Sequence, residues 1–290
     1  MARATLVLLL MLALPAAART FNVGGVQYHE AGDPGAPLVF LLHGTPGSSR
    51  AFNHLLNDER LIAARHLIAV DRPGFGASAS LPPARSFADQ VPLLDPALKR
   101  NRSDVPAVVA GHSLGGSIAY RVAVDRPEAV GALVIISSSL SPRLGRPRWY
   151  NRLAAIPGVR YVVPANLMRA NDEIMPLSRE LKAIEPSLAA IAMPVTIIHG
   201  ARDKLVSVRN LNFAQERLSA ANLTLIRVPK AGHFLLWEQA EIVVEALLAT
   251  SPNTPCNVAV PAPSKEESKR PNCQELRQCN AICRGYPRSS

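Results

Sequence analysis

The sequence predicts an α/β fold, in which a mostly parallel β-sheet carries helices on both faces. Two observations lead to this prediction. Six short runs of apolar and β-branched residues recur along the chain, and segments with helical periodicity lie between them. Alternation of this kind is typical of parallel sheets, because each helix returns the chain to the same end of the sheet.

The six strand-like runs are apolar throughout rather than alternating, so we expect them to be buried on both faces. They comprise residues 36–44, 66–74, 106–113, 130–139, 193–200 and 223–229. Ahead of them, residues 19–32 predict two further strands that turn at Gly24 and Gly25.

Helices are expected between the strands, in residues 51–64, 114–125, 208–221 and 236–249. Residues 86–100 also suit a helix, but Pro92 and Pro96 interrupt that segment. Proline removes a backbone donor and clashes with the preceding turn, so we expect a short or kinked element there.

The alternation of strands and helices breaks twice. Residues 141–192 show no strand pattern and predict a small helical cap, inserted into a core that comprises residues 19–140 and 193–250. Residues 251–290 form a linker rich in Pro, Ser and Lys, followed by a tail that bears the cysteines.

Residues 1–18 predict a secretory signal peptide. Arg3 precedes an apolar run over residues 6–14, and Ala16 and Ala18 supply a cleavage site of the Ala-x-Ala kind. An uncleaved anchor is the alternative, although the apolar run is too short to span a bilayer comfortably. We therefore expect an exported protein, either periplasmic or secreted.

The cysteines all lie in the tail, and export would place them in an oxidising compartment. They are Cys256, Cys273, Cys279 and Cys283. Two disulfides are expected, with three possible pairings. A four-cysteine zinc site is the disfavoured alternative, so we expect no metal and no cofactor.

The chain is basic, with a formal net charge of +10 that comes mostly from arginines spread along the sequence. Nucleic-acid binding favours a clustered basic stripe or aromatic platforms, and neither is found, so we expect no nucleic-acid partner. Four arginines gather at the start of the cap without a nearby acid: Arg143, Arg146, Arg148 and Arg152. One interpretation is attraction to an anionic substrate or membrane surface. The favoured one is a solvated face.

The segment Gly111-His112-Ser113-Leu114-Gly115 fits the G-x-S-x-G nucleophile elbow, with a strand-like run before it and a helix-like one after it. Glycines at both ends remove the Cβ atoms that would obstruct so sharp a turn. The turn would expose the Ser113 hydroxyl at the end of the strand, next to the N-terminus of the following helix.

A serine nucleophile needs a base within reach, and the base needs an orienting acid. Asp203 follows the run 193–200, and His233 follows the run 223–229. Open α/β sheets place their sites at such strand ends. We therefore predict Ser113 as nucleophile, His233 as general acid and base, and Asp203 as the carboxylate that orients the imidazole.

An oxyanion hole requires two backbone N–H donors. One is expected from Leu114, which follows the nucleophile. The other is expected from the loop HGTPGSS, where Pro46 has no N–H and Thr45 is the candidate. His43 is expected to lie buried under this loop, and Asp71 to cap a turn.

The segments HGTPGSS, DRPGFGAS, AGHSLGG, GARD and AGHF occur in the order and approximate spacing of the α/β-hydrolase fold superfamily. From about residue 22 to 250 the chain resembles the branch with a short helical cap. This resemblance implies cofactor-independent hydrolysis through an acyl-enzyme, with the cap over the site. Related dehalogenases and epoxide hydrolases use aspartate where this chain has Ser113, which disfavours those activities.

The leading expectation is a serine-dependent hydrolase of small-to-medium apolar carboxylic esters. The same triad acting on C–C, amide or lactone bonds, or as a perhydrolase, stays open as an alternative, as does a non-catalytic binding protein on this fold. Apolar cap residues are expected to line an acyl pocket or, in the majority, to hold the cap together and onto the core. They are Leu144, Trp149, Tyr150, Leu153, Ile156, Val159, Tyr161, Leu167, Met168 and Met175.

Overall fold

An eight-stranded β-sheet forms the centre of the protein. The computed structural model describes residues 19–252, apart from the side chain of Arg160. The predicted signal peptide, most of the linker and all four cysteines lie outside the described residues, so the signal-peptide and disulfide predictions stay predictions. Within residues 19–252 no helix is long and apolar enough to cross a bilayer.

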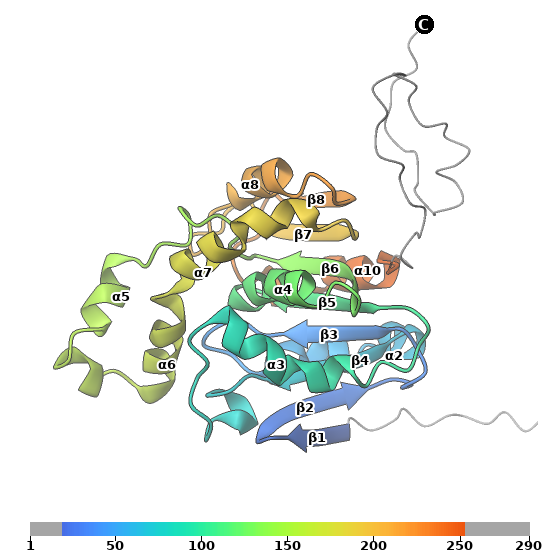
Figure 1. Cartoon of the computed structure of the whole chain (residues 1–290), viewed down its shortest axis with the longest axis horizontal. Helices are drawn as coiled ribbons and strands as arrows, with labels where there is room; N and C mark the ends of the chain where they lie inside the picture. The colour runs from blue at the N-terminus through green and yellow to red at the C-terminus, as the bar shows by residue number, and fades with distance from the viewer. Residues whose placement is uncertain (1–18, 253–290) are drawn as a thin grey trace, which may run out of the picture. The chain divides into compact units, whose positions relative to one another are not determined.

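The strands follow the order β1-β2-β4-β3-β5-β6-β7-β8 across the sheet (Figure 1). They are β1 (Arg19–Val23), β2 (Val26–Ala31), β3 (Leu38–Leu42), β4 (His66–Asp71), β5 (Ala107–His112), β6 (Val130–Ile136), β7 (Val195–Gly200) and β8 (Leu223–Val228). β1 pairs antiparallel with β2, and β2 with β4. All pairs from β4 to β8 are parallel. The predicted mostly parallel sheet and the turn at Gly24 and Gly25 are thus confirmed.

Helices cover both faces of the sheet, as predicted. The ten α-helices of residues 19–252 are α1 (Asn53–Leu56), α2 (Glu59–Ala64), α3 (Phe87–Leu98), α4 (Leu114–Asp125), α5 (Trp149–Ala154), α6 (Ala165–Ile174), α7 (Leu177–Ile184), α8 (Asn210–Arg217), α9 (Leu235–Glu238) and α10 (Ala240–Ala249). One apolar cluster packs α3, α4, α7 and α8 on one face, and a second packs α1, α2, α9 and α10 on the other.

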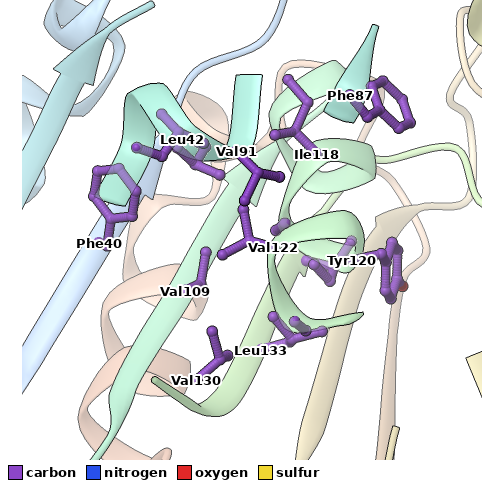
Figure 2. Close-up of a cluster of buried hydrophobic side chains, with 14 of the residues drawn as sticks. Phe40, Leu42, Phe87, Val91, Val109, Ile118, Tyr120, Val122, Val130 and Leu133 are labelled. Atoms are coloured by element: carbon purple, nitrogen blue, oxygen red, sulfur yellow. The ribbon is translucent and has the colours of Figure 1, made fainter. Parts of the chain in front are cut away.

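The first cluster holds α3 and α4 on the middle of the sheet. Val91 of α3 lies beside Val122 of α4, over Val109 of β5 (Figure 2). These side chains are 0–1% exposed, and burying each such side chain contributes roughly 1.5–3 kcal/mol. The position of α4 on β5 is therefore firmly set, and α4 is the helix that follows Ser113.

The element at residues 86–100 is not short, and the last strand is not fully buried, contrary to expectation. α3 runs unbroken for 12 residues although Pro92 and Pro96 lie inside it. Both prolines lie off the packed face, while Val91 and Leu94 are buried, so apolar packing of the helix outweighs the lost backbone bonds. β8 is not buried on both faces, because it is the edge strand and most of its residues are half-exposed or exposed.

The cap segment, residues 141–192, contains α5, α6, α7 and two 3₁₀ helices, η3 (Val159–Tyr161) and η4 (Glu185–Ala190), and no strand. Leu177, Leu181 and Ile184 of α7 join the first apolar cluster. α5 lies at the outer end of the cap, away from the sheet (Figure 1), and it has no buried residue. The two ends of the cap segment are therefore packed very differently.

One buried side chain, Arg72 at the end of β4, joins the core to the cap. Its guanidinium donates hydrogen bonds to the carbonyl oxygens of His43, at 3.2 Å, and Gly44, at 3.0 Å. The same group donates to the Gln90 amide oxygen of α3 and to both carboxylate oxygens of Glu173 in α6. The Arg72 side chain is 0% exposed and that of Glu173 is 2% exposed. This ion pair is therefore a fully desolvated contact between α6 and the end of β4, and the same arginine also bonds to the loop after β3.

His43 lies under that loop, as predicted, and it is fully buried. Its Nε2 accepts the Arg72 backbone N–H at 3.0 Å. The proton is therefore on Nδ1, which donates to the Gly44 carbonyl at 2.7 Å. Burial, aided by the nearby Arg72 charge, lowers the pKa of His43 to about 3. The imidazole is neutral at neutral pH.

The first prediction concerns Glu173. Changing Glu173→Ala leaves the buried Arg72 charge without its carboxylate, which costs about 3–5 kcal/mol of unfolding free energy. Urea titration measures the loss. Glu185→Ala is the matched control, because Glu185 forms a partly exposed ion pair with Arg217 of α8 that should contribute about 0–1 kcal/mol. Equal losses in the two variants would contradict the structural role of the buried pair.

The second prediction concerns the pH dependence of the unfolding free energy. Below about pH 6.5 an unfolded His43 takes up a proton that the folded side chain refuses. The unfolded state then binds more protons, so the unfolding free energy falls as pH falls, by about 1.4 kcal/mol per pH unit from this residue. Denaturant unfolding of the wild type and of His43→Gln between about pH 6 and about pH 4.5 isolates the contribution of His43 to this slope. The variant's slope should be shallower by that amount, and parallel slopes would refute the assignment.

Candidate active site

Ser113 occupies the junction between β5 and α4 in a conformation that side chains rarely adopt. Its backbone has φ +54° and ψ −122°. The Ser113 N–H donates to the Ile136 carbonyl of β6 at 2.9 Å, and the Ser113 carbonyl accepts the Gly116 N–H at 3.1 Å. A strained backbone of this kind persists only where its surroundings fix it.

Close backbone packing explains why the second residue after Ser113 is a glycine. A Cβ atom on Gly115 would lie 2.0 Å from the Leu42 carbonyl oxygen of β3. Any side chain there would push α4 off the sheet. The physical reason for the G-x-S-x-G pattern therefore applies in this chain, with β3 as the neighbour that demands it.

The three residues predicted from the sequence come together at the carboxyl edge of the sheet. Asp203 follows β7 and His233 follows β8. His233 Nε2 lies 3.1 Å from Ser113 Oγ, and His233 Nδ1 lies 2.8 Å from Asp203 Oδ2. The side chain of His233 is 9% exposed and that of Asp203 is fully buried. Carboxylate, imidazole and hydroxyl thus form one hydrogen-bonded series.

The surroundings of Asp203 keep its carboxyl group ionised. Its Oδ1 accepts the backbone N–H groups of Leu205 and Val206, both at 2.8 Å, and its Oδ2 faces His233. Burial raises the pKa of the Asp203 carboxyl, but the hydrogen bond and charge of His233, together with the two N–H groups, outweigh burial and hold the pKa below its usual value. The carboxylate keeps a proton on His233 Nδ1 and leaves Nε2 free to accept from Ser113.

His112 is a supporting residue to which sequence reasoning assigned no role of its own. Its Nε2–H donates to the His233 carbonyl at 3.0 Å, and its ring lies 5.0 Å from the His233 ring and 5.1 Å from that of Trp237. Burial, and the nearby His233, lower the pKa of His112 to about 4. A neutral His112 therefore fixes the backbone of His233. The position of His112 directly before Ser113 is the sequence feature that could have indicated this role.

The loop after β3 lies against the nucleophile. A Cβ atom on Gly44 would lie 2.9 Å from Ser113 Cβ, so Thr45 stands next to Ser113. Within residues 19–252, the backbone N–H groups of Thr45 and Leu114 have no hydrogen-bond acceptor. The Thr45 hydroxyl is also buried without a partner in that part of the chain. These groups are free donors next to the serine.

A cavity of about 420 Å³ contains Ser113, His233 and Thr45. Its walls are largely apolar and come mainly from the cap: Leu144, Tyr150, Ala154, Val163, Leu167, Ala170, Ile174 and Leu177. Three of the residues expected there, Leu144, Tyr150 and Leu167, do line it. Arg146 and Arg148 also border it, and both are exposed to solvent, as the favoured interpretation expected.

No group of three or more His, Cys, Asp or Glu side chains is placed to hold a metal ion in residues 19–252. Asp71, expected to cap a turn, accepts the backbone N–H groups of Ser49 and Ala77 and so ties two loops together. It lines a neighbouring cavity rather than the one that contains Ser113.

Comparison with known proteins places this geometry in context. Two relatives cover most of the described chain. A "Dihydrolipoyllysine-residue acetyltransferase component of acetoin cleaving system" of Pseudomonas putida is 27% identical over 79% of this chain and 67% of its own length. A "Putative carbamate hydrolase RutD" of Klebsiella pneumoniae is 30% identical over 69% of this chain and 85% of its own length.

Solved structures agree at the level of the fold. The crystal structure of Cfl2 from Burkholderia cenocepacia has a TM-score of 0.64 at 19% identity and covers 79% of this chain and 94% of that one. The sequence model of the alpha/beta hydrolase family matches residues 39–246, which is more than half of the chain. The chain therefore belongs to the alpha/beta hydrolase family.

Proposed function

We propose that this protein hydrolyses small-to-medium apolar carboxylic esters through a covalent acyl-enzyme on Ser113. The observation that carries the proposal is the series Asp203–His233–Ser113, with contacts of 2.8 and 3.1 Å, at the wall of a cavity. Membership of a hydrolase family supports hydrolysis in general. The choice of esters is our inference from the site.

In the first half of the reaction, Ser113 Oγ attacks the ester carbonyl carbon while His233 Nε2 takes the hydroxyl proton. Asp203 stabilises the imidazolium that forms. The carbonyl oxygen becomes an oxyanion next to Thr45 and Leu114, whose free N–H groups are suited to stabilise it. His233 then gives the proton to the leaving alcohol oxygen, the C–O bond breaks, and Ser113 carries the acyl group.

In the second half, water attacks the acyl carbon and His233 Nε2 takes its proton. Collapse of the second oxyanion breaks the bond to Ser113 Oγ, which recovers the proton from His233. The products are a carboxylic acid and an alcohol. The apolar cavity walls favour an uncharged acyl chain, and a volume of about 420 Å³ favours a small or medium one.

A carbamate is a second acyl donor that the same steps would cleave. The specific observation in its favour is the printed name of the RutD relative, which shares 30% identity over 85% of its length. The apolar cavity gives no separate reason to prefer it, so esters come first.

The third prediction concerns Ser113. Ser113→Ala should lower kcat/KM for p-nitrophenyl esters by about 10³-fold or more, because within residues 19–252 Ser113 supplies the one hydroxyl that pairs with His233. Ser139→Ala is the matched control, since Ser139 lines the same cavity but is not bonded to His233, and it should stay within a few-fold of wild type. Comparing kcat/KM across esters of increasing acyl-chain length then measures how long an acyl chain the cavity accepts. If the wild type cleaves no ester faster than Ser113→Ala, the proposal fails, and the binding-protein alternative gains.

The fourth prediction concerns the Thr45 hydroxyl, which is buried, unpartnered and next to the nucleophile. If it donates to the oxyanion, Thr45→Val should lower kcat by about a hundredfold with little change in KM, because the bond forms only in the transition state. Thr45→Ser keeps the hydroxyl and should retain most of the rate. An unchanged kcat in Thr45→Val would leave the oxyanion to the backbone N–H groups alone.

A further inference from the structure

The outer end of the cap exposes an unusual number of large apolar side chains. Of the thirteen such side chains that are exposed in residues 19–252, eight lie in the cap segment. The most exposed are Tyr161 at 86%, Val162 at 81% and Trp149 at 74%. We call residues 143–162, which include α5 and η3, the outer cap surface. A concentration of exposed apolar groups of this kind marks an interaction surface.

These residues do not hold the cap onto the core, contrary to expectation. α5 contains Trp149, Tyr150 and Leu153, yet none of its residues is buried. Ile156, just after α5, is 49% exposed. The apolar contacts that attach the cap come instead from α7, from Leu188 of η4 and from Ile174 at the end of α6. Trp149 and Tyr150 contact each other edge to face, with ring centroids 5.9 Å apart, and neither is buried in the described chain.

The same surface carries four exposed arginine side chains. The sequence from residue 129 to 171 contains no aspartate or glutamate. The side chains of Arg143, Arg146, Arg148 and Arg152 are exposed, and within residues 19–252 none of them pairs with a carboxylate. The Arg148 guanidinium donates to the carbonyl oxygens of Lys204 and Leu205.

The outer cap surface also borders the cavity that contains Ser113. Arg146, Arg148 and Tyr150 contribute to the cavity wall, and α5 forms the end of the cap that extends beyond the sheet (Figure 1). Whatever covers this surface would lie next to the cavity wall.

We propose that the outer cap surface docks on an anionic phospholipid bilayer. Tryptophan and tyrosine favour the headgroup level of a bilayer, where their rings are dry and their polar atoms stay wet. Arginine binds phosphate oxygens through its planar guanidinium. The combination of exposed aromatic and basic residues on one short segment is the pattern of peripheral membrane attachment. Docking goes beyond the proposed function, because it does not depend on Ser113.

A second copy of this chain is the other occupant to consider, and the charges disfavour it. In a two-fold dimer the same surface meets itself. The four exposed arginines of each copy would then face those of the other with no acid from residues 129–171 between them. Anionic lipid supplies the missing negative charge.

The test uses the full chain with Ser113→Ala, so that hydrolysis cannot consume the lipid and failure of the proposed function does not affect the result. Sedimentation measures binding to vesicles of phosphatidylcholine alone or mixed with phosphatidylglycerol. We expect binding to the mixed vesicles that weakens with salt. Adding Trp149→Ser and Tyr161→Ser should weaken it about tenfold or more. Arg143→Gln with Arg152→Gln should weaken it about fivefold for each arginine.

Matched controls lie outside the cap segment, in the core. Lys99→Gln with Arg102→Gln removes the same charge from exposed positions ahead of β5, and Val23→Ser with Leu93→Ser removes exposed apolar groups of the core. Both double variants should bind like the parent. Equal losses in controls and cap variants, or no binding to the mixed vesicles, would overturn the proposal. So would a dimer in sedimentation velocity that Trp149→Ser and Tyr161→Ser abolish, because a second copy would then cover the surface.

Discussion

The abrupt change from β5 to α4 within one residue is the constraint on which the site depends. It forces Ser113 to φ +54°, which costs of order 1–3 kcal/mol, and it brings the α4 backbone close enough to β3 that Gly115 admits no side chain. The hydrogen bond from Ser113 N–H to Ile136 and the buried faces of α4 hold this arrangement. As a result the hydroxyl lies at the carboxyl edge of the sheet. The loops that carry Asp203 and His233 follow β7 and β8, parallel strands that end at the same edge.

The cap takes part in this geometry through polar contacts with two loops of the site. Arg72 holds the carbonyl groups of His43 and Gly44 on one side and Glu173 of α6 on the other. The loop that presents Thr45 is thereby linked to the cap. Arg148 makes a second link, to the loop after Asp203. A displacement of the cap would therefore reach both the loop that carries Thr45 and the loop that carries Asp203.

Local patterns were sufficient to predict the sheet and the three residues that meet in the site. Continuous apolar runs fix strands, and strand ends in a parallel sheet meet at one edge, so Ser113, Asp203 and His233 could be brought together without coordinates. Tertiary effects could not be predicted in this way. The pairing of Arg72 with Glu173 joins residues far apart in sequence, and the continuity of α3 through its prolines depends on packing against α4. The solvent exposure of a side chain also depends on tertiary packing. The apolar residues of α5 give the same sequence pattern whether or not they pack against the core.

The attachment of α5 shows why the surroundings of the cap matter. Asn151 and Asn171 exchange hydrogen bonds of 3.0 Å, and Arg148 bonds to the loop after Asp203. Each such bond contributes a net 0.5–1.5 kcal/mol or so, and no buried apolar side chain of α5 adds to them. Burying one large apolar side chain such as that of Trp149 contributes about as much as two of these bonds. A lipid surface that covers Trp149 and Tyr161 would therefore contribute a free energy comparable to that of the hydrogen bonds that attach α5 to the rest of the protein.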